Sequence, residues 1–116
     1  MTVSQKVASL LLETKAVKLS PAQPFKWSSG WNSPIYCDNR VTLSFAEGRT
    51  FIKKSLAKAI KKHFPDAELV AGVATAGIPQ GALLANDLDL PFLYVRSKPK
   101  GHGMENTIEG KVVVNQ

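Results

Sequence analysis

Two short apolar runs separated by one helical segment constrain the fold of this chain most strongly. Residues 68–73 (ELVAGV) are typical of a buried parallel strand, and residues 92–95 (FLYV) form a second strand candidate. Between them, a small-residue turn at 74–77 (ATAG) leads into an expected helix at about 78–86. This order predicts a right-handed βαβ unit in an α/β fold, with any ligand site along the carboxyl edge of the sheet.

The turn at 74–77 has the composition of a phosphate-binding loop. Its small side chains let a ligand approach backbone N–H groups, and the helix that follows directs the positive end of its dipole toward the same place. Strand-to-helix crossovers without a ligand also use small residues, so the turn alone leaves both interpretations open.

Positive side chains are concentrated immediately after the second strand candidate, in the segment 94–110 (YVRSKPKGHGMENTIEG). Pro and Gly among them disfavour helix and strand, so we expect a mobile loop that closes over a multiply charged anion such as pyrophosphate. Arginine offers a planar fork to phosphate oxygens, and histidine carries a proton that can move near neutral pH. A solvated basic loop is the alternative. The cations are Arg96, Lys98, Lys100 and His102.

The remaining segments predict helices and short strands. We expect an amphipathic helix at about 2–15, a short extended piece near 25–27, a β-rich run at 35–37 and a long helix at about 45–64. A third β-like run begins at 111–114.

Net charge and cysteine content limit the classes of function. Much of the formal charge of +6 comes from lysines within 51–64, which we interpret as the wet face of the long helix. Nucleic-acid binding by that face is a weaker alternative, because no aromatic residues interleave with the lysines. The single cysteine, Cys37, fits a reducing compartment and is expected to be a packed strand residue. With no apolar leader or spanning segment in the sequence, we expect a cytoplasmic protein without a membrane partner.

Three stretches occur in the order and spacing of one enzyme family: FKWSSGWNSPIYCDNR at 25–40, ELVAGVATAGIPQGALLA at 68–85 and VRSKPKGHGMENTIEG at 95–110. Together they closely resemble the orotate phosphoribosyltransferases, and the resemblance covers the chain as the N-terminal half of such an enzyme. It implies the type I phosphoribosyltransferase fold, an α/β fold with a mostly parallel sheet, flanking helices and an N-terminal hood. The expected organisation is a single domain, 1–116, with the hood at about 1–44 and a partial core at about 45–116.

The resemblance also implies a reaction. The family transfers the phosphoribosyl group from 5-phosphoribosyl 1-pyrophosphate to orotate and gives orotidine 5′-monophosphate and pyrophosphate, a step of pyrimidine nucleotide synthesis. Mg²⁺ is the implied cofactor, bound mainly through the pyrophosphate of the substrate and without metal-ligating side chains. The implied partners are the two small-molecule substrates and a second copy of the chain in a homodimer, with no nucleic acid.

Arg96, Lys100 and His102 match the family's contacts to the phosphoribosyl donor. The resemblance gives Lys100 and His102 a catalytic role as well, on a loop that reaches the site of the neighbouring subunit. Cations that contact the pyrophosphate more strongly as its charge develops would lower the barrier to its departure.

Two further groups of residues are matched to binding roles. The family's pyrophosphate loop, which acts mainly through its backbone, corresponds to Thr75, Ala76 and Gly77. The orotate pocket of the hood corresponds to Ser28, Ser29 and Tyr36. The alternatives are that the two serines form a turn and that Tyr36 is a packed strand residue. Asp38 and Arg40 are expected to pair locally and hold the hood, and a catalytic role is the alternative.

The family's motif for the ribose and 5′-phosphate, an apolar strand followed by two acids and a Thr/Ser-Gly-rich loop, does not occur in these 116 residues. We therefore expect the chain to be truncated before that motif and inactive or incomplete by itself. A non-enzymatic module that keeps the fold for nucleotide sensing or assembly is the alternative function.

Overall fold

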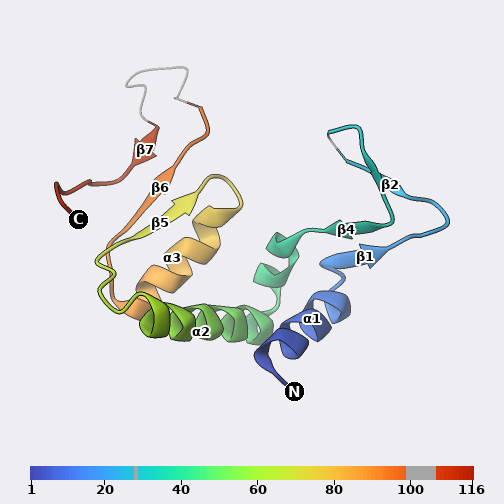
Figure 1. Ribbon diagram of the computed structural model, residues 1–116, viewed down its shortest axis with the longest axis horizontal. Helices are drawn as coiled ribbons and strands as arrows, with labels where there is room; N and C mark the ends of the chain where they lie inside the picture. Colours follow the sequence, from blue (N-terminus) through green and yellow to red (C-terminus); the bar gives the residue numbers. More distant parts are fainter. Residues whose placement is uncertain (28, 99–106) are drawn as a thin grey trace. The chain divides into compact units, whose positions relative to one another are not determined.

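The computed structural model describes residues 1–27, 29–98 and 107–116. The chain divides into two compact units, Met1–Ile52 and Lys53–Gln116, and the long helix α2 (Ala46–His63) crosses from one to the other (Figure 1). The boundary lies inside α2, a little beyond the expected end of the hood at about residue 44. The single-domain organisation stays a prediction.

The first unit begins with α1 (Val3–Glu13), close to the expected helix at 2–15. Thr2 caps it: its Oγ1 accepts a hydrogen bond from the Gln5 backbone N–H (3.2 Å), and the Gln5 side chain accepts one from the Thr2 backbone N–H (3.0 Å). This reciprocal pair is a capping box, which satisfies two backbone donors that the helix itself cannot use.

Two small antiparallel ribbons follow α1. In one, β1 (Val17–Leu19) pairs with β4 (Ile35–Cys37); in the other, β2 (Phe25–Lys26) pairs with β3 (Asn32–Ser33). The 3-10 helix η1 (Asn39–Ser44) then leads into α2, and its residue Thr42 is fully buried. Cys37, expected to be packed, is exposed, because among the described residues β4 pairs with β1 alone, in a two-stranded ribbon that leaves Cys37 open to solvent.

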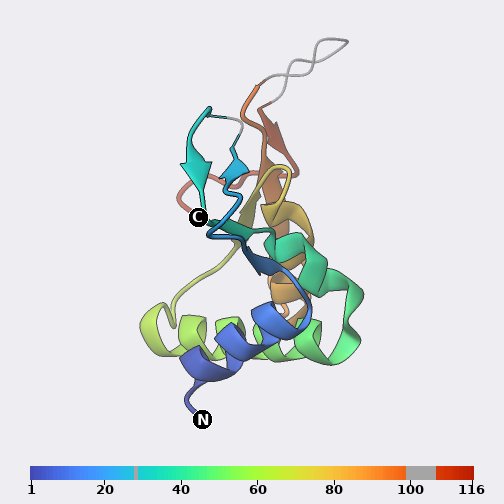
Figure 2. The same cartoon turned by 90° about the vertical axis from the view of Figure 1, so that its right-hand side faces the viewer.

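The second unit contains the predicted βαβ arrangement. β5 (Val70–Val73) pairs in parallel with β6 (Phe92–Val95), residue for residue from Val70 opposite Phe92 to Val73 opposite Val95. The connecting helix α3 (Gly77–Leu88) packs against both strands and lies alongside them in both views (Figure 1 and Figure 2). The buried apolar side chains of this unit include Leu84, Ala85 and Leu93.

Close approach of α3 to the sheet depends on glycine. A Cβ atom at Gly72 would lie 2.7 Å from the carbonyl oxygen of Gly77, and one at Gly81 would lie 2.7 Å from Cε1 of Phe92. Real Cβ atoms do not approach other atoms so closely. The absence of side chains at these two positions therefore sets how near the first turns of α3 come to β5 and β6.

The third strand of the sheet differs from the expectation. It is β7 (Ile108–Glu109), which pairs antiparallel with β6, while residues 111–114, expected to form a strand, do not form one. Gly110 has φ +130°, a conformation that favours glycine, and it passes close to Leu93. The chain therefore turns at Gly110, and the expected strand was placed a few residues too late.

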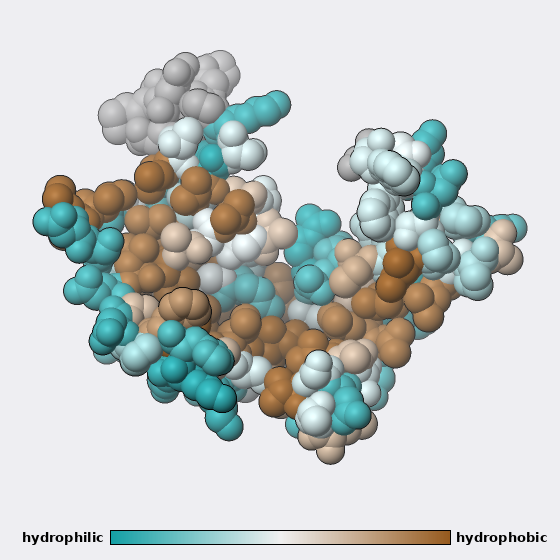
Figure 3. All heavy atoms as spheres, in the orientation of Figure 1, coloured by the Kyte–Doolittle hydropathy of each residue, from teal (hydrophilic) through white to brown (hydrophobic). Residues whose placement is uncertain are grey.

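The sheet is also less covered than its apolar sequence predicts. With the strand order β5–β6–β7, β5 is an edge strand, and Val73 is 67% exposed although we expected a buried strand. Val112, Val113 and Val114 are exposed as well, and hydrophobic surface extends over this part of the second unit (Figure 3).

Some lysines of α2 have ionic partners within the second unit. Lys54 donates a hydrogen bond to the Asp87 carboxylate on α3, and the Lys53 Nζ lies 3.9 Å from it. The hydrogen bond from Lys54 lowers the pKa of Asp87. The lysine-bearing face of α2 therefore also contacts α3 through these ionic interactions. No helix within the described ranges is both long and apolar enough to cross a lipid bilayer.

The glycine contacts can be tested by comparing Gly72→Ala with Gly77→Ala. Gly72→Ala should lower the free energy of unfolding by about 1–3 kcal/mol, the usual cost of overpacking, because the new methyl group meets backbone. At Gly77 the nearest atom to an added Cβ is 3.7 Å away, an ordinary contact. Urea unfolding followed by circular dichroism measures the free energy of unfolding of both variants. Equal losses of this free energy in Gly72→Ala and Gly77→Ala would contradict the prediction.

Candidate functional site

The first part of the candidate site is the turn between β5 and α3. The Ala74 backbone N–H donates to the Val95 carbonyl (2.8 Å), which ties the turn to the end of β6, and the Ala74–Thr75 peptide bond is cis. Thr75 and Ala76 are exposed, and Gly77 begins α3. The helix N-terminus carries backbone N–H groups, and the methyl side chain of Ala76 has no acceptor with which to cap them. Such an end is suited to an anion.

The second part is Arg96, which directly follows β6. Its backbone N–H donates to the Thr107 carbonyl (2.6 Å), and its Nε donates to the Glu109 carboxylate (3.2 Å). The guanidinium lies 5.4 Å from the Tyr94 ring centroid, and its side chain is 34% exposed. Because Val73 is paired with Val95, the 74–77 turn and Arg96 follow the same end of the parallel pair. The structure thus brings Thr75, Ala76, Gly77 and Arg96 to one edge of the sheet, as the sequence predicts.

Three of the predicted site residues are outside the described ranges: Ser28, Lys100 and His102. Their expected roles stay predictions.

The predicted orotate residues of the first unit are separated by the structure. Tyr36, 41% exposed, lines an open hollow of about 490 Å³ together with Lys26, Trp27 and Cys37. Its ring is 5.8 Å from that of Phe25. Ser29 does not line this hollow; its Oγ accepts from the Trp31 backbone N–H at 3.5 Å, within the turn that joins β2 to β3. The geometry of Ser29 favours a turn-forming role, whereas Tyr36 is available to a ligand.

Sequence reasoning missed Lys26 as a member of this hollow. The sequence shows Lys26 next to Trp27 in a predicted extended segment. The face of the strand on which Lys26 lies depends on the pairing of Lys26 with Asn32, and that register is known only from the structure. Its ammonium group would supply positive charge beside an aromatic ring.

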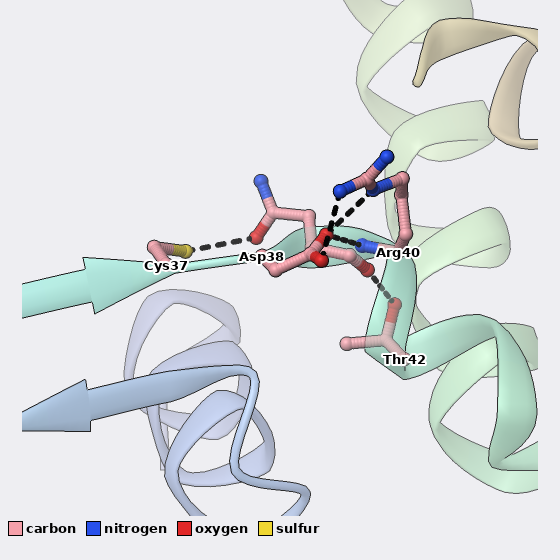
Figure 4. A network of polar contacts seen from close by, with 5 residues as sticks. Cys37, Asp38, Arg40 and Thr42 are labelled. Atoms are coloured by element: carbon pink, nitrogen blue, oxygen red, sulfur yellow. Dashed lines mark hydrogen bonds and ion pairs between the residues drawn. The ribbon is translucent and has the colours of Figure 1, made fainter. Parts of the chain in front are cut away.

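Asp38 and Arg40 form the expected local pair (Figure 4). Arg40 Nε lies 2.8 Å from Asp38 Oδ1 and Nη2 lies 3.0 Å from Oδ2, and the Arg40 backbone N–H also donates to Oδ1. The two side-chain contacts make the ion pair bidentate, and the bond from the Arg40 backbone N–H makes Asp38 the N-cap of η1 beside the end of β4. The hydrogen bond from the Arg40 side chain lowers the pKa of Asp38, and the same bond raises the pKa of Arg40. Within the described ranges, no cluster of three or more His, Cys, Asp or Glu residues could hold a metal ion.

Curated proteins similar to this chain share one name. Orotate phosphoribosyltransferase from Cytophaga hutchinsonii is 58% identical over the whole chain, and that from Streptococcus pneumoniae serotype 4 is 55% identical over the whole chain. The chain covers 56% and 55% of these relatives.

The chain belongs to the orotate phosphoribosyltransferase family. It spans about half the length of the curated relatives it matches, as expected for an N-terminal portion. No family model matches it.

Solved structures agree with this family. The crystal structure of orotate phosphoribosyltransferase from Aeropyrum pernix is 34% identical, with a TM-score of 0.72 over 89% of this chain and 56% of that chain. UMP synthase from Leishmania donovani is 24% identical and shows the fold alone, with a TM-score of 0.75 over 97% of this chain and 23% of that chain. The α/β fold is that of the type I phosphoribosyltransferases.

The Asp38–Arg40 pair of this family member can be tested by titration. A carboxyl group with a lowered pKa adds stability above its ordinary value of 3.8 and loses that contribution as the pH falls through its folded value. NMR titration should give Asp38 a midpoint below 3.8, and Arg40→Gln should return it toward 3.8. Arg49→Gln is the control, because Arg49 donates to the Leu43 carbonyl and not to Asp38. An unchanged midpoint in Arg40→Gln would contradict the assigned cause.

Proposed function

We propose that the protein containing this chain is an orotate phosphoribosyltransferase that transfers the phosphoribosyl group of 5-phosphoribosyl 1-pyrophosphate to orotate. The carrying observation is the shared sheet edge, where the 74–77 turn and Arg96 follow β5 and β6. Relatives at 55–58% identity that bear this enzyme's name support it.

The chemistry assigned to this edge is stabilisation of a departing pyrophosphate. The bond from ribose C1 to the pyrophosphate oxygen breaks, a bond from C1 to N1 of orotate forms, and the N1 proton leaves. Negative charge grows on the pyrophosphate while the sugar becomes positive, so donors fixed near the pyrophosphate lower the barrier. Backbone N–H groups of 75–77 and the Arg96 guanidinium are such donors. Lys100 and His102 are the proposed catalytic residues.

Mg²⁺ belongs to this proposal as a cofactor held mainly by the pyrophosphate of the substrate. Mg²⁺ prefers oxygen ligands, retains several waters and usually binds through substrate phosphates plus one or two carboxylates. When bound, it neutralises part of the pyrophosphate charge. The residues of this chain that fit such a complex are Arg96 and the backbone of the 74–77 turn, which would bind phosphate oxygens and not the ion itself.

The orotate site is assigned to the hollow in the first unit. Tyr36 offers an aromatic face to the pyrimidine ring, and Lys26 provides a cation for the orotate carboxylate. Ser28 and Ser29 are kept as proposed orotate contacts on the family resemblance alone. A homodimer in the cytoplasm completes the proposal: the segment that carries Lys100 and His102 serves the neighbouring subunit, and the exposed thiol of Cys37 suits a reducing compartment.

The catalytic assignment can be tested in a polypeptide of the relatives' full length that contains this chain. Lys100→Ala should lower kcat about 100-fold, because a removed cation no longer stabilises the developing charge. Lys58→Ala, at an exposed position of α2, is the control and should stay within about twofold of the parent. Loss of orotate absorbance in the presence of 5-phosphoribosyl 1-pyrophosphate and Mg²⁺ measures both. Donor binding without turnover, insensitive to Lys100→Ala, would favour the non-enzymatic alternative.

The role of Lys26 is tested separately with Lys26→Met. Loss of the ammonium should raise the KM for orotate about tenfold or more, since a charge-assisted contact to the carboxylate is lost. The KM for the phosphoribosyl donor should not change. Lys58→Met, at an exposed position of α2, serves as the control. Equal orotate KM values in Lys26→Met and its parent would contradict the assignment of Lys26 to the orotate site. Such a result would not bear on the assignment of the donor site.

A further inference from the structure

The Arg96 guanidinium is held by two side chains of the β6–β7 pair. Tyr94 on β6 and Glu109 on β7 are directly opposite each other in the antiparallel register, and Arg96 extends over this pair. Its Nε donates to Glu109 Oε1 at 3.2 Å, its Nη2 approaches the Tyr94 hydroxyl at 3.4 Å, and its Cζ lies 5.4 Å from the Tyr94 ring centroid.

These contacts define the direction of the guanidinium. The group is planar, so fixing Nε at Glu109 and one Nη nitrogen at Tyr94 determines where the remaining N–H bonds point. Within the described residues, the Nη1 group of Arg96 has no hydrogen-bond partner, and 34% of the side chain remains exposed. Arg96 therefore keeps donors for a ligand while its side chain is already ordered.

Glu109 is suited to this task by its burial and its charge. Its side chain is 20% exposed, so the ion pair is only partly screened by solvent. An arginine that must be ordered at the moment of binding loses rotamer freedom, and an arginine that is already held loses less. The carboxylate also belongs to a strand that is hydrogen-bonded to β6, which fixes its distance from the Arg96 backbone.

We propose that Glu109 is a positioning residue of the donor site: it acts through Arg96 and orients the guanidinium toward the pyrophosphate of the substrate. The proposal rests on the proposed function, in which Arg96 binds that pyrophosphate. A plain structural ion pair, which holds β7 to β6 and does nothing for binding, is the competing explanation.

The test uses a polypeptide of the relatives' full length that contains this chain, and steady-state kinetics with 5-phosphoribosyl 1-pyrophosphate as the varied substrate. Glu109→Ala should raise the KM for this donor about 10- to 100-fold, because displacement of a positioning group is costly, while kcat changes less. Glu109→Gln should recover most of the loss, since its amide oxygen still accepts from Nε. In an Arg96→Ala background, Glu109→Ala should have no further effect on this KM.

Asp87→Asn is the matched control, because it removes a carboxylate that pairs with a lysine in the same unit but away from the donor site. It should leave the donor KM unchanged, whatever it does to the thermal unfolding midpoint. The positioning role is overturned if Glu109→Ala tightens donor binding, or if its effect multiplies with that of Arg96→Ala. It is also overturned if Glu109→Ala lowers only the unfolding midpoint. An unchanged donor KM in Arg96→Ala would instead contradict the proposed function.

Discussion

The parallel pairing of β5 with β6 is the interaction on which the candidate donor site depends. It places two chain segments that are distant in sequence at one sheet edge, the 74–77 turn and Arg96. The pairing is supported by α3, which comes close only because Gly72 and Gly81 carry no side chains. The geometry of the candidate donor site is therefore determined by backbone positions and by the absence of side chains at two glycines as much as by charged groups.

Features that arise from local chemistry could be predicted from sequence. The helices α1 and α2 occupy nearly their expected ranges, and Asp38 pairs with Arg40 two residues away. The βαβ unit was also predictable, because a tight turn after an apolar run and a short helix before the next run leave few topologies. Each of these depends on residues that are close together in sequence.

Features that depend on register between distant segments could not be predicted. Nothing local in residues 108–114 says which part pairs with β6, so the third strand was expected at 111–114 instead of at β7. Lys26 and Glu109 were missed because each acquires its significance from a residue on another element: Lys26 lines a hollow with Tyr36 of β4, and Glu109 contacts Arg96 after β6. Burial at a sheet edge, as at Val73, is likewise set by the whole sheet.

The link between Arg96 and Thr107 has a consequence for how this part of the chain can vary. A backbone hydrogen bond of 2.6 Å and the antiparallel β6–β7 pair fasten both anchors of the intervening stretch. Since the entropic cost of closing a loop rises only slowly with its length, a longer connection between these fixed anchors would cost the fold little. The β6–β7 pair therefore tolerates different numbers of connecting residues, whereas the proposed catalytic roles of Lys100 and His102 restrict which residues of that connection can be exchanged.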